Sequence, residues 1–235
     1  MEITVHGYGP NDNVETQVDP THAALRESIR PLEHNVGGVI GGHYGVTAAS
    51  GLLAVQTAAS SGLFAVRWYS PSAKLMVLLK LTIGINVTTN YSAATDGGEP
   101  DFEMYLSRNY LTNPSGGNTA AAWGSISQLS RNTMAPSEFT TNGAIQVANT
   151  GALTTGSPTL DSYPYSYAVG SSLGRSLGSL GTAELVNVYR TGQHPIVFNS
   201  NQGLLVRNTR QLAGAAGTGV SRINVAMEWA EVAAY

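Results

Sequence analysis

The chain contains no cysteine among its 235 residues and has few charged side chains. Without cysteine it forms neither disulfides nor thiolate metal sites, so its stability must come from core burial, backbone pairing and association between subunits. Charged residues make up 11% of the sequence, less than half the usual share for a soluble domain. Lys74 and Lys80 are its only lysines. A surface rich in Ala, Gly, Ser, Thr and Asn is better suited to close lateral packing in an assembly than to the solubility of a free monomer.

Positive charge and long apolar runs are also scarce, which argues against two classes of partner. The formal net charge is −3 and the arginines are spread along the chain, whereas phosphate binding needs clustered Lys and Arg. The strongest apolar run, Leu75 to Ile85, is interrupted by Lys80 and is too short to span a bilayer. Residues 1–4 lack the features of a secretory signal. We therefore expect no nucleic-acid or membrane partner, and assembly in a cytoplasm.

No arrangement of reactive side chains indicates an enzyme. Gly170–Gly174 fits the G-x-S-x-G pattern of a nucleophile elbow, which requires a strand before it and a helix after it. The run that follows is broken by glycines, and no aspartate occurs after Ser172. The five histidines lack the spacing of a metal site. We expect no catalytic residue, no cofactor and no metal ligand.

The densest acidic cluster consists of Asp96, Glu99, Asp101 and Glu103. Its spacing differs from that of an EF-hand loop, so a solvated turn is the default interpretation and cation binding the alternative. Asp101 and Glu103 alternate with apolar residues and are expected to share the solvent face of an edge strand. A glycosidase pair would need two of these acids about 5 to 10 Å apart across a groove.

Alternating apolar and polar residues predict an all-β protein. Strands are expected within residues 36–49, 63–69, 74–89, 101–107, 145–147, 183–189, 194–199, 201–208 and 223–232. The segment 74–89 is the strongest, apolar on both faces, with Gly84 as the expected bend. Trp68, Trp123 and Trp229 are candidate packing anchors, and Trp229 is placed in the core. Strands at this density, with few helical patterns, predict a single antiparallel β-sandwich.

The N-terminal part of the chain differs from the rest. Residues 1–20 hold too few apolar side chains to bury a core and are expected to form an extended N-terminal arm, leaving 21–235 as the sandwich domain. Two interpretations of residues 21–30 stay open. Asp19 and Pro20 can begin a short helix, or the segment can be an extended strand that ends at Pro31.

Five segments carry a resemblance to a known class of protein. They are Ala24–Pro31 (ALRESIRP), Leu63–Trp68 (LFAVRW), His194–Val197 (HPIV), Asn201–Asn208 (NQGLLVRN) and Val225–Val232 (VAMEWAEV). Together they resemble virion structural proteins of tailed bacteriophages, which are jelly-roll β-sandwiches used as capsid cement or decoration subunits. The resemblance implies a jelly-roll fold for this chain and brings no catalytic residue with it.

The same resemblance implies a function and its partners. The chain is expected to be a non-enzymatic cement or decoration protein that binds the outer surface of a phage head and stabilises contacts between capsomers. Its expected partners are the major capsid protein and further copies of itself, in a homotrimer. Its expected location is the capsid surface of the virion, after assembly in the host cytoplasm.

The candidate interface residues are aromatic: Tyr8, Trp123, Tyr163, Tyr165 and Tyr167. The last three place their rings on one side of a five-residue segment. If they are exposed, they suit a protein interface or stacking against sugars; if they are buried, they belong to the core. The alternative function is therefore a tail-associated or lectin-like module that recognises host-surface glycans.

Overall fold

The computed structural model of the chain describes residues 18–19, 24–25, 42–53, 58–89, 101–119, 127–128, 136–168, 180–189, 194–209 and 219–232. The chain forms two units, Met1–His34 and Asn35–Tyr235. Within the described ranges, no helix is long and apolar enough to cross a membrane.

The first unit contains one pair of described strands. β1 (Val18–Asp19) pairs antiparallel with β2 (Ala24–Leu25). The expected boundary between arm and domain, after residue 20, lies within this pair of strands. Of the two interpretations of residues 21–30, Ala24–Leu25 adopt the strand. The other residues of that segment, and residues 1–17 of the expected arm, lie outside the described part of the chain.

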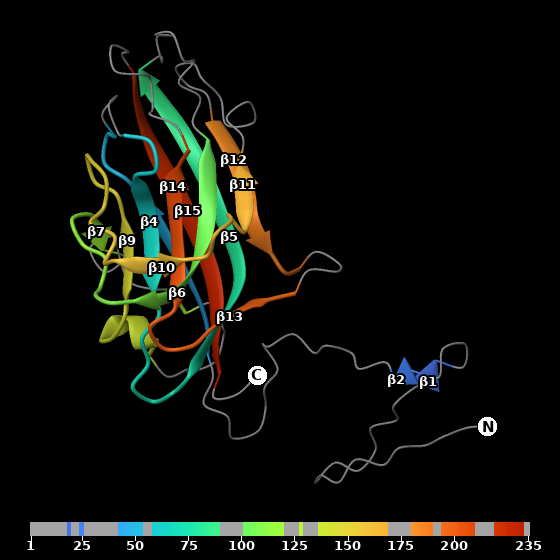
Figure 1. Cartoon of the computed structure of the whole chain (residues 1–235). Coiled ribbons are helices and arrows are strands. Elements are labelled where there is room, and N and C mark those ends of the chain that lie inside the picture. Colours follow the sequence, from blue (N-terminus) through green and yellow to red (C-terminus); the bar gives the residue numbers. More distant parts are fainter. Residues whose placement is uncertain are drawn as a thin grey trace. The chain divides into compact units, whose positions relative to one another are not determined.

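The second unit is a sandwich of two antiparallel sheets (Figure 1). Of the described strands, six form sheet I and seven form sheet II. Sheet I consists of β12 (Leu180–Asn187), β5 (Leu75–Thr89), β15 (Val220–Val232), β3 (Gly42–Ala49) and β8 (Ser127–Gln128) in that order, with β13 (Ile196–Phe198) also paired to β5. Sheet II consists of β10 (Pro158–Leu160), β6 (Phe102–Tyr110), β14 (Gly203–Asn208), β4 (Gly62–Arg67), β9 (Ala144–Val147) and β7 (Asn118–Thr119), with β11 (Ser166–Ala168) also paired to β6.

The order of the strands is that of a jelly roll. β3, β4, β5 and β6 alternate between the two sheets, and after β10 and β11 the chain crosses again through β12, β14 and β15. This path produces the neighbour orders β3-β15-β5-β12 and β4-β14-β6-β10. Each sheet thus interleaves strands from the first and second halves of the chain, as in two nested Greek keys. The predicted fold class, an antiparallel jelly-roll-like sandwich, is confirmed.

The alternation of side chains explains the strands that face the core. In β15, Ile223, Val225 and Met227 are buried while Arg222 and Asn224 are exposed, which is the period of two that a half-buried strand requires. β5 spans nearly the whole predicted segment 74–89. It lies inside sheet I, with β15 on one side and β12 and β13 on the other, so its apolar character follows from burial.

Two sequence expectations for these strands were wrong. The pairing of β5 shifts register opposite Glu184–Val186, Val220–Ser221 and Glu228–Trp229, and it stays in register at Gly84. A Cβ atom at Gly84 would lie 3.2 Å from the carbonyl oxygen of Gly181, so close strand approach explains this glycine better than a bend. β6 is not an edge strand either, because β14 pairs with one side of it and the short strands β10 and β11 pair with the other.

Aromatic side chains fill the interior between the sheets. Trp68 and Trp229 are fully buried, as expected for packing anchors. The ring of Phe139, in the 3-10 helix η3 (Glu138–Thr140), lies edge-on to both, with centroid distances of 5.1 Å to Trp68 and 5.3 Å to Trp229. Tyr44 stacks on Trp229 at 5.7 Å. Such aromatic pairs add about 0.5–1.5 kcal/mol each beyond their burial. Trp123 lies outside the described residues.

Candidate functional site

Three of the predicted interface residues are on the surface. Tyr163, Tyr165 and Tyr167 are 82%, 49% and 50% exposed, which excludes a place in the core. The backbone N–H of Tyr165 donates to the carbonyl of Met104 at 2.7 Å, and β11 continues this pairing along β6. The segment 163–167, called the tyrosine segment below, therefore lies beside β6 on the side away from β14 (Figure 1). Tyr8 and Trp123 lie outside the described residues.

Charged and aromatic side chains lie next to the tyrosine segment. The pairing register places Tyr167, Glu103 and Arg207 in one row across β11, β6 and β14. The guanidinium carbon of Arg207 lies 4.0 Å from the centre of the Tyr105 ring, and its Nε lies 3.4 Å from Glu103 Oε2. The Tyr105 hydroxyl donates to the same carboxylate at 3.1 Å. The exposed tyrosine rings can stack on a planar group or a sugar ring, and the Arg207–Glu103 pair beside them can make polar contacts with the edge of that ligand.

Of the acidic cluster, Asp101 and Glu103 are described, and neither lies in the solvated turn expected of the cluster. Asp101 is only 3% exposed and precedes β6, and its Oδ2 accepts from the Tyr167 hydroxyl at 3.4 Å. Glu103 is paired with Arg207. Asp96 and Glu99 lie outside the described residues. Among the ranges that the structure describes, no group of three or more His, Asp or Glu side chains is arranged to hold a metal ion.

A buried carboxylate that the sequence reasoning missed lies at the end of β15. Glu231 is 1% exposed and its Oε1 accepts hydrogen bonds from the Trp229 indole at 3.1 Å, from Ser137 Oγ at 2.5 Å and from the Glu138 backbone N–H at 3.2 Å. Burial raises the pKa of Glu231, and these hydrogen bonds and the charge of Lys74 oppose that effect only in part. Every second residue of this strand points inward, as Met227 and Trp229 do. Glu231 continues this alternation, which could have placed it in the core.

Glu138 is the second carboxylate of this cluster. It forms a salt bridge with Lys74 at 3.2 Å and accepts from Ser72 Oγ at 2.6 Å and from Asn142 Nδ2 at 3.0 Å. Burial opposes ionisation of Glu138, but the hydrogen bonds from Ser72, Lys74 and Asn142 outweigh it, and the pKa of Glu138 is lowered. Glu231 is enclosed and Glu138 is held by Lys74. The two acids therefore fasten η3 to the sandwich and do not present a catalytic pair to a substrate.

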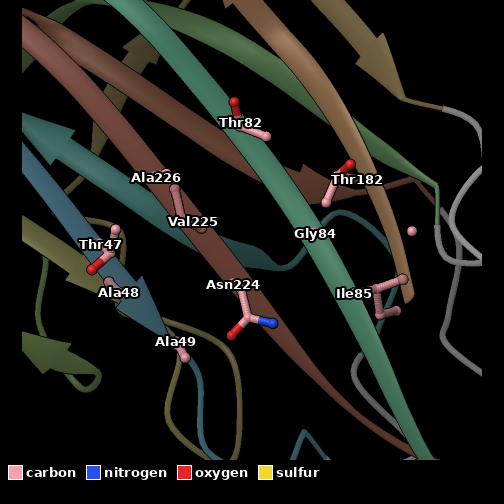
Figure 2. Close-up of a pocket in the computed structure, with 11 residues that line it drawn as sticks. Thr47, Ala48, Ala49, Thr82, Gly84, Ile85, Thr182, Asn224, Val225 and Ala226 are labelled. Carbon is pink, nitrogen blue, oxygen red and sulfur yellow. The ribbon is translucent and has the colours of Figure 1, made fainter. Parts of the chain in front are cut away.

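A shallow groove crosses the outer face of sheet I (Figure 2). It measures about 470 Å³ and is lined by residues of β3, β15, β5 and β12. The side chains that reach it are small: Thr47, Ala49, Thr82, Thr182, Asn224 and Ala226. Gly84 leaves the floor of the groove as bare backbone. The lining contains threonine hydroxyls but no acidic or basic side chain that would activate them, so the groove is described as a surface for contact.

No protein-family model and no curated protein matches the chain. Among solved structures, a chain of the Israel acute paralysis virus pentamer is similar at 10% identity and a TM-score of 0.26, over 97% of this chain and 79% of that one. A chain of a structure described as "KBV activated particle at acidic pH" is similar at 12% identity and a TM-score of 0.21, over 97% of this chain and 86% of that one. Similarity at this level carries no functional argument, and the jelly-roll assignment rests on the strand order above.

Proposed function

We propose that this chain is a non-enzymatic structural subunit of a virus particle, a cement or decoration protein that binds the outer surface of the capsid and stabilises contacts between capsomers. The observation that carries the proposal is the combination of a jelly-roll strand order with an interior filled by buried apolar side chains, Trp68 and Trp229 among them. Jelly rolls serve as capsid, lectin and cupin domains. A filled interior favours a capsid or lectin domain, because the partners of these domains bind on the outer surface of the sandwich.

The surface of the chain supports attachment to a shell. Few charges and an exposed tyrosine segment allow extensive contact with little desolvation of ionic groups. We assign that segment to the contact with the major capsid protein. The tailed-phage head, the homotrimer and the location on the capsid surface belong to the same proposal and come from the sequence resemblance. Many copies, each with a modest contact, would add their effects over the shell.

The copy number of the chain in purified virions tests the proposal most directly. Quantitative mass spectrometry against the major capsid protein should give hundreds of copies in a simple ratio to the shell protein. A dozen copies or fewer would place the chain at the tail or portal vertex and favour receptor binding. Absence from the particle would remove the virion role altogether.

The tyrosine segment makes a specific prediction for attachment. Replacing Tyr163, Tyr165 and Tyr167 with serine should weaken binding to shells that lack the protein by at least about tenfold, because aromatic anchors carry much of the energy of an interface. Binding is measured by co-sedimentation with those shells. Tyr69→Ser is the matched control, since Tyr69 is exposed but lies at the end of β4. Equal binding by the triple variant and the control would show that the shell contacts another surface.

Glycan binding is the second candidate function, favoured by the acids and the arginine beside the tyrosine segment. Carbohydrate sites commonly pair an aromatic face with carboxylate and amide or guanidinium groups that hold the hydroxyls. The same triple variant separates the two functions: loss of binding on a glycan array with unchanged attachment to shells would favour the lectin-like module.

A further inference from the structure

The outer face of sheet I is built for close contact at its centre. The pairing register aligns two rows of side chains across β3, β15, β5 and β12: Ala49, Asn224, Gly84 and Thr182 in one, and Thr47, Ala226, Thr82 and Glu184 in the next. Thr47, Thr182, Asn224 and Ala226 are exposed. Apart from Glu184, which stands at the β12 edge, these side chains are small enough to let another layer of strands approach to about the 10 Å spacing of packed sheets.

Charges of opposite sign lie at the two ends of this face. On one side of the central rows, Arg222 is exposed and lies opposite Asn86. On the other side, Glu228 lies opposite Lys80, which in turn reaches Glu184 at 3.9 Å. Among the described side chains of the face, the row of Arg222 and Asn86 therefore carries one positive charge. The row of Glu228 and Lys80, taken together with Glu184 in the row beside it, carries a net negative charge. Arg222 and Glu228 lie three residues before and after Val225, on the same strand and the same side of the sheet.

This arrangement is complementary to itself under one symmetry operation. A twofold axis that lies in the interface and runs across the strands exchanges the two ends of the face while each strand stays opposite its own copy. Arg222 of each subunit then meets Glu228 of the other, and the small residues meet at the centre. A twofold axis along the strands would instead place Arg222 against Arg222, which like-charge repulsion disfavours.

We infer that a second copy of this chain docks on the outer face of sheet I, with the two β15 strands facing each other in opposite directions around such a twofold axis. The groove of Figure 2 is the centre of this contact. The contact does not depend on the virion role, since it concerns two copies of the free chain. A dimer of this kind would replace the homotrimer of the proposed function.

Substitution at the centre of the face tests the contact. The full chain should be a dimer by analytical ultracentrifugation, and Ala226→Arg should weaken dimerisation by at least about a hundredfold, because two long charged side chains would be forced together. Thr47→Arg, on the neighbouring strand, should act in the same direction and serves as the second variant if Ala226→Arg fails to fold. Near-ultraviolet circular dichroism checks the fold of each variant.

Exchange of the charges tests the orientation. Arg222→Glu and Glu228→Arg should each weaken the dimer by about tenfold, since each removes two symmetric pairs and creates two repulsions. The double variant should regain most of the wild-type affinity, because each new glutamate again faces a new arginine. Arg108→Glu is the control. Arg108 lies on β6 of the other sheet, is exposed and forms an ion pair with Asp161, so its change should leave the dimer unaltered.

Any of the following results would overturn the inference. They are a chain that stays monomeric at high concentration, a dimer that tolerates both Ala226→Arg and Thr47→Arg, and a double charge exchange that fails to restore the dimer. A trimer insensitive to these substitutions would also contradict it, while leaving the cement proposal intact. Conversely, a dimer with this mutational pattern in a chain absent from virions would keep the inference and remove the proposed function.

Discussion

Glu231 is an acid held in the core by hydrogen-bond donors, so its titration affects folding. Burial raises its pKa in the folded protein. Between the ordinary pKa of an unfolded glutamate and this raised value, the folded state binds more protons than the unfolded state. Stability therefore falls as the pH rises through this window. Glu138 has the opposite effect on stability, because its pKa is lowered and its contribution increases as the pH rises. Lys74 and Tyr44 are the other titratable side chains described next to these two acids.

Glu231→Gln should remove the first of these contributions. The amide oxygen still accepts from Ser137 and Trp229, but the side chain no longer ionises. Relative to the wild type, the variant should therefore gain free energy of unfolding as the pH rises from the ordinary pKa of glutamate through the raised pKa of Glu231. Urea denaturation at several pH values gives this difference. Stability curves that stay parallel over the whole range would contradict the assigned ionisation.

The sequence identified some of these residues and left others open for physical reasons. Trp229 could be placed in the core because Ile223, Val225 and Met227 precede it at a period of two. The same period reaches Glu231, but burial of a charge is costly, so polarity alone assigns it to solvent. The exposure of the tyrosine segment could not be predicted, because a short strand does not show which of its faces another part of the chain covers.

At the scale of the elements, the contact between β14 and β4 depends on a missing side chain. A Cβ atom at Gly203 would collide with the carbonyl oxygen of Val66 on the neighbouring strand. Gly203→Ala should therefore destabilise the sandwich by about 1–3 kcal/mol through forced backbone movement. Gly151→Ala is the matched control, since an added Cβ there meets nothing within 4 Å. Chemical denaturation compares the two, and equal stabilities would show that the strands separate without cost.

Long strands could be predicted from sequence, whereas most strands of two or three residues could not. The segments 74–89 and 223–232 correspond to β5 and β15 because their many apolar residues give a clear pattern. β7, β8 and β11 have two or three residues each, too few to show a period, and they form because a longer strand offers its edge. β10 and β11 are also too short to predict from sequence, and without them β6 has the pattern of an edge strand.

At the scale of the whole molecule, the second unit has its own core. Among the described residues, the clustered core side chains lie between Tyr44 and Trp229, within Asn35–Tyr235. Deleting residues 1–34 should leave a folded sandwich whose melting temperature changes by no more than about 5 °C. Under the cement proposal, the deletion should also weaken attachment to shells, as expected of an arm that reaches a neighbouring subunit. A truncated chain that fails to fold would make the first unit part of the sandwich.

The arrangement of the sheets was accessible only through resemblance. Periodicity predicts strands but not their partners, and most neighbours in this sandwich are distant in sequence: β3 pairs with β15, and β4 pairs with β14. Such pairings are selected by the packing of complete faces, which no local pattern records.

The position of β15 has a consequence for the synthesis of the protein. Sheet I is joined through this strand, because β15 lies between β3 and β5 and pairs with both along most of its length. On the ribosome, β3 and β5 are synthesised well before β15. Until β15 is made, the edges of β3 and β5 that pair with it lack their partner strand. Closure follows only when residue 232 has been made. A chain interrupted before that point lacks the centre of a sheet, so translation to the end of β15 is itself the condition for a subunit that can assemble.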